Sequence, residues 1–177
     1  MRDNQGDIGD QFKKIGKGVI IYPWAKIIKP EVIEIGDYSA IDDFTFIYGG
    51  KGIRIGRYVH ISSFTSIIGG GELILEDYVG LSAGVRIITG TERYEGGKRM
   101  SAALPYSQRN LVLGCVIMEK DAFIGTNAVI HPNVRIGEGA IIGANSFVNK
   151  DVEPWSINIG SPCKKIGSRP RVTVEDI

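Results

Sequence analysis

Two histidines are the first side chains of this 177-residue chain that could carry out chemistry, because imidazole exchanges protons near neutral pH. His60 lies in the segment GRYVHISSF, directly before Ile61 and two residues before Ser62. His131 directly precedes Pro132. These residue types and this spacing indicate proton transfer by a general base with hydroxyls nearby, and His60 is the first candidate base and His131 the second.

The elements that must position these side chains follow from a six-residue repeat. Units of three hexads start at positions 15, 35, 55 and 75, which is a 20-residue period, and at 118 and 136, an 18-residue period. Hexads of this kind predict an all-β parallel β-helix with three short strands per coil. The aliphatic positions of the repeat are Ile15, Ile21, Ile27, Ile35, Ile41, Ile47, Ile55, Ile61, Ile67, Leu75, Leu81, Ile87, Met118, Ile124, Ile130, Ile136, Ile142 and Val148.

Stacking of the coils predicts what surrounds His60. Side chains alternate along a strand, so His60 and Ser62 face outward on either side of the inward Ile61. One unit later, Gly80 falls on His60 and Ser82 falls on Ser62, which predicts open space beside the imidazole and two stacked hydroxyls. The Gly residues that follow many of the aliphatic positions predict corners with an unusual backbone angle. The pattern therefore indicates a small polar pocket around His60.

Composition and charge favour one domain over residues 1–177, built layer by layer. A formal net charge of +1 gives no electrostatic reason for binding nucleic acid or an anionic membrane. The N-terminal segment MRDNQGDIGDQF is polar, and no apolar run approaches the length of a membrane span. We expect a cytoplasmic protein without membrane insertion.

Two segments interrupt the repeat. Residues 93–114 form an excursion loop rich in Gly, charged residues and Tyr, and long loops in compact repeat proteins usually carry function. Residues 154–177 form a C-terminal extension that follows the last coil directly. Its basic cluster predicts a bound anion, and the cluster consists of Lys164, Lys165, Arg169 and Arg171.

These features together resemble the hexapeptide-repeat acyltransferases. The resemblance runs from about residue 15 to 169 and is carried by the hexads, the loop after SAGVRIITGTERYEGG, the block IGTNAVIHPNVRIGEGAIIGANSFVNKDVEPW and the ending IGSPCKKI. Within the family, the chain looks most like the sugar and nucleotide-sugar acetyltransferases of surface polysaccharide synthesis. The resemblance implies a left-handed coil, which the sequence alone does not, since parallel crossovers are nearly always right-handed.

The family also implies a homotrimer with acetyl-CoA bound in the cleft between neighbouring subunits. Small residues at the corners of the C-terminal coils let the pantetheine arm approach the backbone, and here they match Gly125, Thr126, Gly143 and Ala144. The coil corners require small residues for packing as well. Phosphate contacts would fall to basic side chains, and the candidates are Lys150, Lys164, Lys165 and Arg169.

Acyl transfer from a thioester requires a base for the acceptor's proton and donors for the oxyanion. We expect His60 as the base, Ser82 or a backbone amide beside the acceptor or oxyanion, and the 93–114 loop over the acceptor. Many family members carry a catalytic His in the stretch matching ITGTERYEGG, which here has none. Glu92 in that stretch could accept a proton, bind an ammonium group or orient His60 of a neighbouring subunit, and a substrate-assisted route needs no dedicated base.

The predicted function is therefore acetyl-CoA-dependent N-acetylation of a nucleotide-linked amino sugar, because an amine needs less activation than a hydroxyl. O-acetylation of a sugar or another hydroxyl is the first alternative, and a non-catalytic β-helix that binds or scaffolds is the second. A carbonic-anhydrase-like β-helix would need three histidines on one metal in each site, and two histidines per chain cannot supply three such sites in a trimer. We expect no metal to be required.

Overall fold

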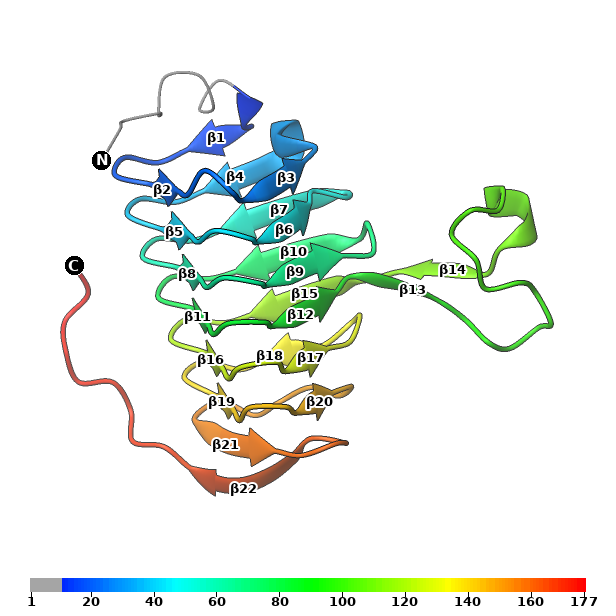
Figure 1. Ribbon diagram of the computed structural model, residues 1–177. Coiled ribbons are helices and arrows are strands. Elements are labelled where there is room, and N and C mark those ends of the chain that lie inside the picture. Colours follow the sequence, from blue (N-terminus) through cyan, green and yellow to red (C-terminus); the bar gives the residue numbers. More distant parts are fainter. Residues whose placement is uncertain (1–10) are drawn as a thin grey trace.

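Residues 11–177 are described in a computed structural model, and they form a three-sided prism of stacked coils (Figure 1). Each coil contributes one short strand to each of three parallel sheets, here named face 1, face 2 and face 3. Face 1 consists of β1 (Lys14–Ile15), β4 (Ile33–Ile35), β7 (Gly52–Ile55), β10 (Glu72–Leu75), β15 (Cys115–Met118) and β18 (Arg135–Ile136).

Face 2 has the same construction and ends in an antiparallel pair, β21 and β22, that closes the last coil. It consists of β2 (Ile20–Ile21), β5 (Ala40–Ile41), β8 (His60–Ile61), β11 (Gly80–Leu81), β16 (Phe123–Ile124), β19 (Ile141–Ile142), β21 (Ser156–Ile159) and β22 (Lys164–Ser168). Face 3 consists of β3 (Lys26–Ile28), β6 (Phe46–Tyr48), β9 (Ser66–Ile68), β12 (Arg86–Ile88), β17 (Val129–Ile130) and β20 (Phe147–Val148). A 3₁₀ turn, η2 (Pro30–Val32), precedes β4.

The strands pair in the register that the repeat predicts, so the aliphatic residues stack into three inner columns. Leu75, for example, pairs with Ile55 in the coil before it and with Met118 in the coil after the loop. From Ile35 to Val148 these residues are buried, and each contributes about 1.5–3 kcal/mol of hydrophobic stabilisation. Ile15, Ile21 and Ile27 are only partly buried.

The unusual backbone angle predicted at the Gly of each corner is wrong for Gly36 and Gly56. The left-handed conformation instead falls two residues later, at Tyr38 (φ 58°) and Tyr58 (φ 54°). Glycine is needed for space, because a Cβ at Gly36 would lie 2.6 Å from the carbonyl carbon of Gly56 in the next coil. The corner glycines therefore permit close stacking of coils.

The excursion leaves the prism at the corner between faces 3 and 1 as an antiparallel ribbon of β13 (Gly90–Glu92) and β14 (Leu111–Leu113) (Figure 1). The loop beyond it contains a short 3₁₀ turn, η3 (Tyr106–Gln108). After β22 the chain runs back along the corner between faces 1 and 2, where Asp176 pairs with Lys120. The extension thus packs on the outside of coils far from it in sequence.

Candidate active site

His60 lies on the outer surface of face 2 and is held by a carboxylate from the preceding coil. Its Nε2 is 3.1 Å from Oδ2 of Asp42, the residue that follows β5. The His60 side chain is 55% exposed and that of Asp42 is 27% exposed. The imidazole is therefore reachable from solvent while one of its nitrogens already has a partner.

The space predicted beside His60 is occupied. Gly80 does pair with His60 in the strand register, but the ring of Phe123 from the following coil lies over it. Its Cδ2 is 3.1 Å from where a Cβ of Gly80 would stand. The prediction of open space is therefore wrong, because an aromatic side chain leans into the gap that glycine leaves. The Phe123 ring therefore lines the site next to Gly80.

The predicted stacking of Ser62 and Ser82 follows from the same register, since the Ser62 amide donates to the carbonyl of Leu81. Both serines are half-buried on the outer side of face 2. In the described part of the chain, neither hydroxyl has a hydrogen bond, so both can serve a bound molecule. A column of Asp42, Ser62 and Ser82 thus lines the face next to His60.

Glu92 lies far from His60 within one chain, because the β13–β14 ribbon leaves the prism on the side opposite face 2 (Figure 1). Its Oε1 accepts a hydrogen bond from Nε of Arg109 and forms an ion pair with a terminal nitrogen of the same guanidinium. Among the residues described, Glu92 Oε2 is buried without a hydrogen-bond partner. Glu92 therefore fastens the base of the loop within its own chain.

His131 is on face 3, where its ring meets that of Phe147 edge-on at a centroid separation of 5.8 Å. It is half-buried and its backbone amide donates to the carbonyl of Val148. The structure does not bring His131 and His60 together in one chain, since they are on different faces.

The four small residues predicted to approach the cofactor meet at the corner between faces 2 and 3. The Asn145 amide donates to the carbonyl of Thr126, and both Thr126 and Ala144 are exposed. A Cβ at Gly125 would lie 2.6 Å from the Ala144 nitrogen, and one at Gly143 would lie 2.6 Å from Ile159 Cγ2. Packing of the coils thus requires both glycines, whatever else they contact.

The basic residues of the extension differ in what holds them. The Lys165 ammonium is 2.7 Å from Glu153 Oε2 and lowers the pKa of that carboxyl. Arg169 donates to the carbonyls of Asp121 and Gly139, at 3.1 and 3.3 Å, and lies over the ring of Trp155. Burial raises the pKa of the Asp121 carboxyl. Arg169 is therefore a structural cation in this chain.

Lys150 and Lys164 are exposed, and no hydrogen bond or ion pair of either ammonium group occurs among residues 11–177. They are the candidates of the basic set that remain available to a phosphate. The structure therefore divides the four predicted cations into two available and two engaged.

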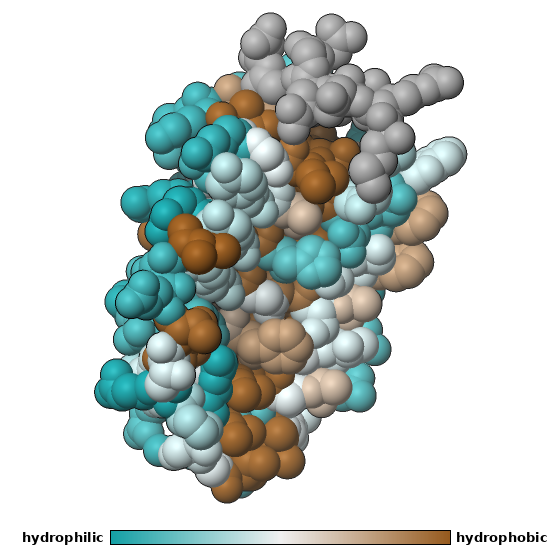
Figure 2. All heavy atoms as spheres, turned by 90° about the vertical axis from the view of Figure 1, so that its left-hand side faces the viewer, coloured by the Kyte–Doolittle hydropathy of each residue, from teal (hydrophilic) through white to brown (hydrophobic). Residues whose placement is uncertain are grey.

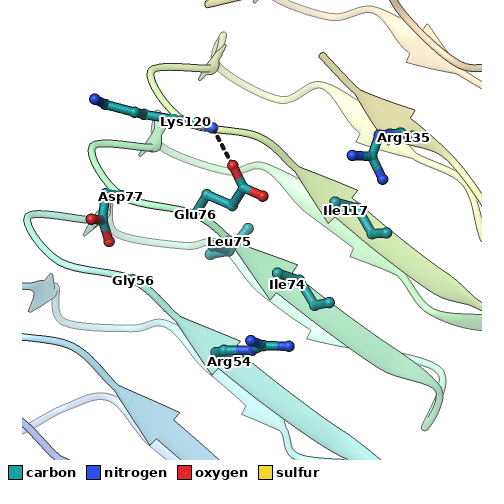
Figure 3. Close-up of a pocket in the computed structure, with 9 residues that line it drawn as sticks. All are labelled: Arg54, Gly56, Ile74, Leu75, Glu76, Asp77, Ile117, Lys120 and Arg135. Carbon is teal, nitrogen blue, oxygen red and sulfur yellow. Dashed lines mark hydrogen bonds between the residues drawn. The ribbon is translucent and has the colours of Figure 1, made fainter. Parts of the chain in front are cut away.

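A shallow depression of about 450 Å³ lies on face 1 and contains none of the predicted site residues (Figure 3). Ile74 and Ile117 form its floor, with Arg54 and Arg135 at either end. Arg135 is paired with Glu119.

The described residues contain no group of three or more His, Cys, Asp or Glu able to hold a metal. Within the same residues, no helix has the length and apolar character to cross a membrane.

Comparison with known proteins identifies the family. The family model for bacterial transferase hexapeptide (six repeats) matches residues 115–150. The dTDP-4-amino-4,6-dideoxy-D-glucose acyltransferase of Escherichia coli is 36% identical over 165 residues, which is 93% of this chain and 86% of that protein. The chain belongs to the hexapeptide-repeat acyltransferases.

Two further relatives match this hexapeptide-repeat acyltransferase, one over most of the chain and one over about a third of it. The N-acyltransferase AntD from Bacillus cereus, solved with dTDP and 3-hydroxybutyryl-CoA, superposes with a TM-score of 0.87 at 35% identity, covering 92% of this chain and 86% of AntD. Chloramphenicol acetyltransferase of Klebsiella aerogenes is 45% identical over 64 residues, only 36% of this chain and 30% of that enzyme. The predicted family, the left-handed parallel β-helix and the acyltransferase class are confirmed.

Sequence reasoning about this hexapeptide-repeat acyltransferase missed Asp42 and Phe123 beside His60, and Arg109 at the base of the excursion loop. The position of Asp42 was predictable from the repeat, because it stands 20 residues before Ser62 and therefore in the same column of face 2. Phe123 follows the excursion loop, so counting one repeat length along the sequence from Gly80 does not reach it. Arg109 carried no signal, since the path of an irregular loop is not periodic.

Proposed function

We propose that this enzyme transfers an acyl group from acyl-CoA to the amino group of a nucleotide-linked amino sugar, and that dTDP-4-amino-4,6-dideoxyglucose is its acceptor. The observation that carries the proposal is the likeness to the Escherichia coli acyltransferase named for this substrate, which extends over 93% of the chain. AntD, which was solved with dTDP and an acyl-CoA, supports it through a match over 92% of this chain. The alternative of a hydroxyl acceptor has no comparable support.

The reaction needs little from the protein beyond placement and one proton transfer. The neutral amine attacks the thioester carbonyl, a C–N bond forms, the C–S bond breaks, and CoA leaves as a thiolate that takes up a proton. His60 is the proposed base, and Ser82 or a backbone amide on face 2 steadies the acceptor or the oxyanion. Lys150 and Lys164 are proposed to contact CoA phosphates, beside Thr126 and Ala144 along the pantetheine arm.

The differences between the three faces support a proposed homotrimer. Face 1 presents charged side chains such as Lys14, Glu34 and Arg54, whereas the corner between faces 2 and 3 carries a ladder of Trp24, Phe44 and Phe64. These three rings stack and are 68%, 56% and 60% exposed. Figure 2, which views the side bearing face 2, also shows hydrophobic residues in patches. Burial of an apolar surface of this kind against other copies of the chain is favourable.

The proposed trimer completes the site. With the aromatic corner turned toward the threefold axis, face 2 of one subunit opposes face 3 of its neighbour, whose loop leaves from the far end of that face. The loop would then reach over His60 of the adjacent subunit. Since acyl-CoA and nucleotide sugars are metabolites of the cytoplasm, we propose that the enzyme works there and supplies surface polysaccharide synthesis.

The test is release of CoA thiol from acetyl-CoA and from 3-hydroxybutyryl-CoA, each with dTDP-4-amino-4,6-dideoxyglucose and with its 4-hydroxy counterpart. Turnover with the amine alone, and a product heavier by one acyl group, is expected. Turnover with the hydroxyl alone would replace the proposal by O-acylation. No turnover with either acceptor, together with no binding of acyl-CoA by calorimetry, would leave a non-catalytic binding protein.

A further inference from the structure

Asp42 stands beside His60 without any role in the fold that explains its carboxylate. Its backbone amide is already fixed, since it donates to the carbonyl of Ile61 at 2.9 Å. In the described chain, its side chain makes one polar contact, from Oδ2 to His60 Nε2 at 3.1 Å. Both groups lie on the outer surface of face 2, where the core gains nothing from their contact.

The chemistry of the pair fixes where the proton of His60 sits. An aspartate carboxylate only accepts hydrogen bonds, so Nε2 must carry the hydrogen. A neutral imidazole then has its lone pair at Nδ1, which is the nitrogen left to take a proton. We propose that Asp42 is a positioning residue that holds His60 in the Nε2–H tautomer, with Nδ1 directed to the acceptor amine. This inference rests on the proposed function.

The neighbours of His60 on face 2 indicate that Asp42 is the residue that orients the imidazole. The strands on either side of β8 place Ala40 and Gly80 opposite His60, and neither side chain ionises. Ser62 and Ser82 are the nearest outward residues of the next column, and both are neutral at the pH of interest. Among the residues described, Asp42 is thus the charged group that faces His60. The ring of Phe123 covers Gly80, on the side of His60 that is opposite Asp42.

Asp42 acts twice in the transfer step. Before the amine attacks, the Asp42 carboxylate orients the imidazole ring and excludes the other tautomer. As the C–N bond forms and the C–S bond breaks, the amine proton moves to Nδ1, and the carboxylate stabilises the imidazolium until the proton passes to the CoA thiolate. No further reactant is needed to balance the step.

The experiment compares Asp42→Asn with Asp43→Asn. Asp43 is the next residue, and its carboxylate accepts the amide hydrogen of Trp24 at 2.8 Å, which makes it a matched control. The side-chain amide that Asp42→Asn introduces can donate a hydrogen bond to Nε2, and it so favours the wrong tautomer. We expect Asp42→Asn to lower kcat about 10²-fold with KM for both substrates nearly unchanged, Asp42→Glu to restore part of kcat, and Asp43→Asn to keep kcat.

The second readout is the ¹⁵N chemical shifts of the imidazoles in histidine-labelled protein, with His131 as the internal reference. Wild type is expected to give the Nε2–H pattern for His60, and Asp42→Asn to lose it. An unchanged kcat together with unchanged shifts in Asp42→Asn would overturn the proposal. Wild type without any acyl transfer would refute the proposed function instead, while full turnover of His60→Ala would remove His60 as base and Asp42 with it.

Discussion

Glu92 and Arg109 form an ion pair across the base of the excursion loop, and each side chain is only 12% exposed. The pair joins the last residue of β13 to the residue two positions before β14, where the chain leaves and rejoins the ribbon. One carboxylate oxygen accepts the hydrogen bond from Nε and pairs with the terminal nitrogen, and the other is buried with no hydrogen-bond partner in the described chain. The position of the loop therefore depends on an ion pair whose burial costs desolvation.

Replacing Arg109 by Met should release the loop, because it leaves the Glu92 carboxylate buried and unpaired. Removing one partner of a buried ion pair costs about 3–5 kcal/mol, which here falls on the loop rather than on the prism. Limited proteolysis should cut residues 93–114 much faster in Arg109→Met than in wild type. Arg99→Met, in an exposed part of the same loop, is the control.

The double variant Glu92→Gln with Arg109→Met should recover part of the protection, since it removes the unpaired charge. If Glu92→Gln alone keeps the loop protected but loses kcat, Glu92 touches the reaction directly. That result would contradict a purely structural role for the pair.

Lys164→Ala should weaken acyl-CoA binding and Arg169→Ala should not. Lys164 is exposed and unpaired among residues 11–177, and an exposed ion pair worth about 1 kcal/mol corresponds to roughly fivefold in KM. Arg169 instead donates to two backbone carbonyls, so its removal should lower the melting temperature. Lys165→Ala, which breaks only the exposed pair with Glu153, is the control in both measurements. A larger KM effect for Arg169→Ala would reverse the assignment.

Phe44→Lys should separate the proposed trimer into monomers. The substitution places a charge in the middle of the Trp24–Phe44–Phe64 ladder, where assembly would have to desolvate it. Sedimentation velocity gives the molecular mass directly. Arg54→Glu on face 1 should leave the mass unchanged, and a trimeric Phe44→Lys would mean that the ladder is not at the interface.

Gly139→Ala should destabilise the prism far more than Gly97→Ala. Both glycines have positive φ, 64° and 66°, so both substitutions carry the left-handed penalty of about 1–2 kcal/mol. A Cβ at Gly139 would also lie 2.4 Å from the Trp155 ring, which adds about 1–3 kcal/mol of overpacking. Around Gly97 the space is open. Urea denaturation should show the difference, and equal losses would mean that Trp155 moves aside without cost.

Much of the candidate site was predictable because it is periodic. The register of Gly80 on His60 and of Ser82 on Ser62 follows from counting 20 residues, since each coil is pinned by its inward aliphatic residue. The ring of Phe123 over Gly80 was not predictable, because side-chain direction depends on packing between coils. The engagement of Arg169 likewise depends on a segment that folds back across several coils.

The sequence by itself determined the coil: the hexads set which side chain faces inward, which column each outward residue joins and where the loop interrupts the prism. A one-residue slip would expose the buried column, so the pattern admits a single register. Only the tertiary structure decided which charges meet. Glu92 with Arg109 and Lys165 with Glu153 each involve a residue of the excursion loop or of the C-terminal extension, and such residues find their partners by distance in space rather than by the repeat.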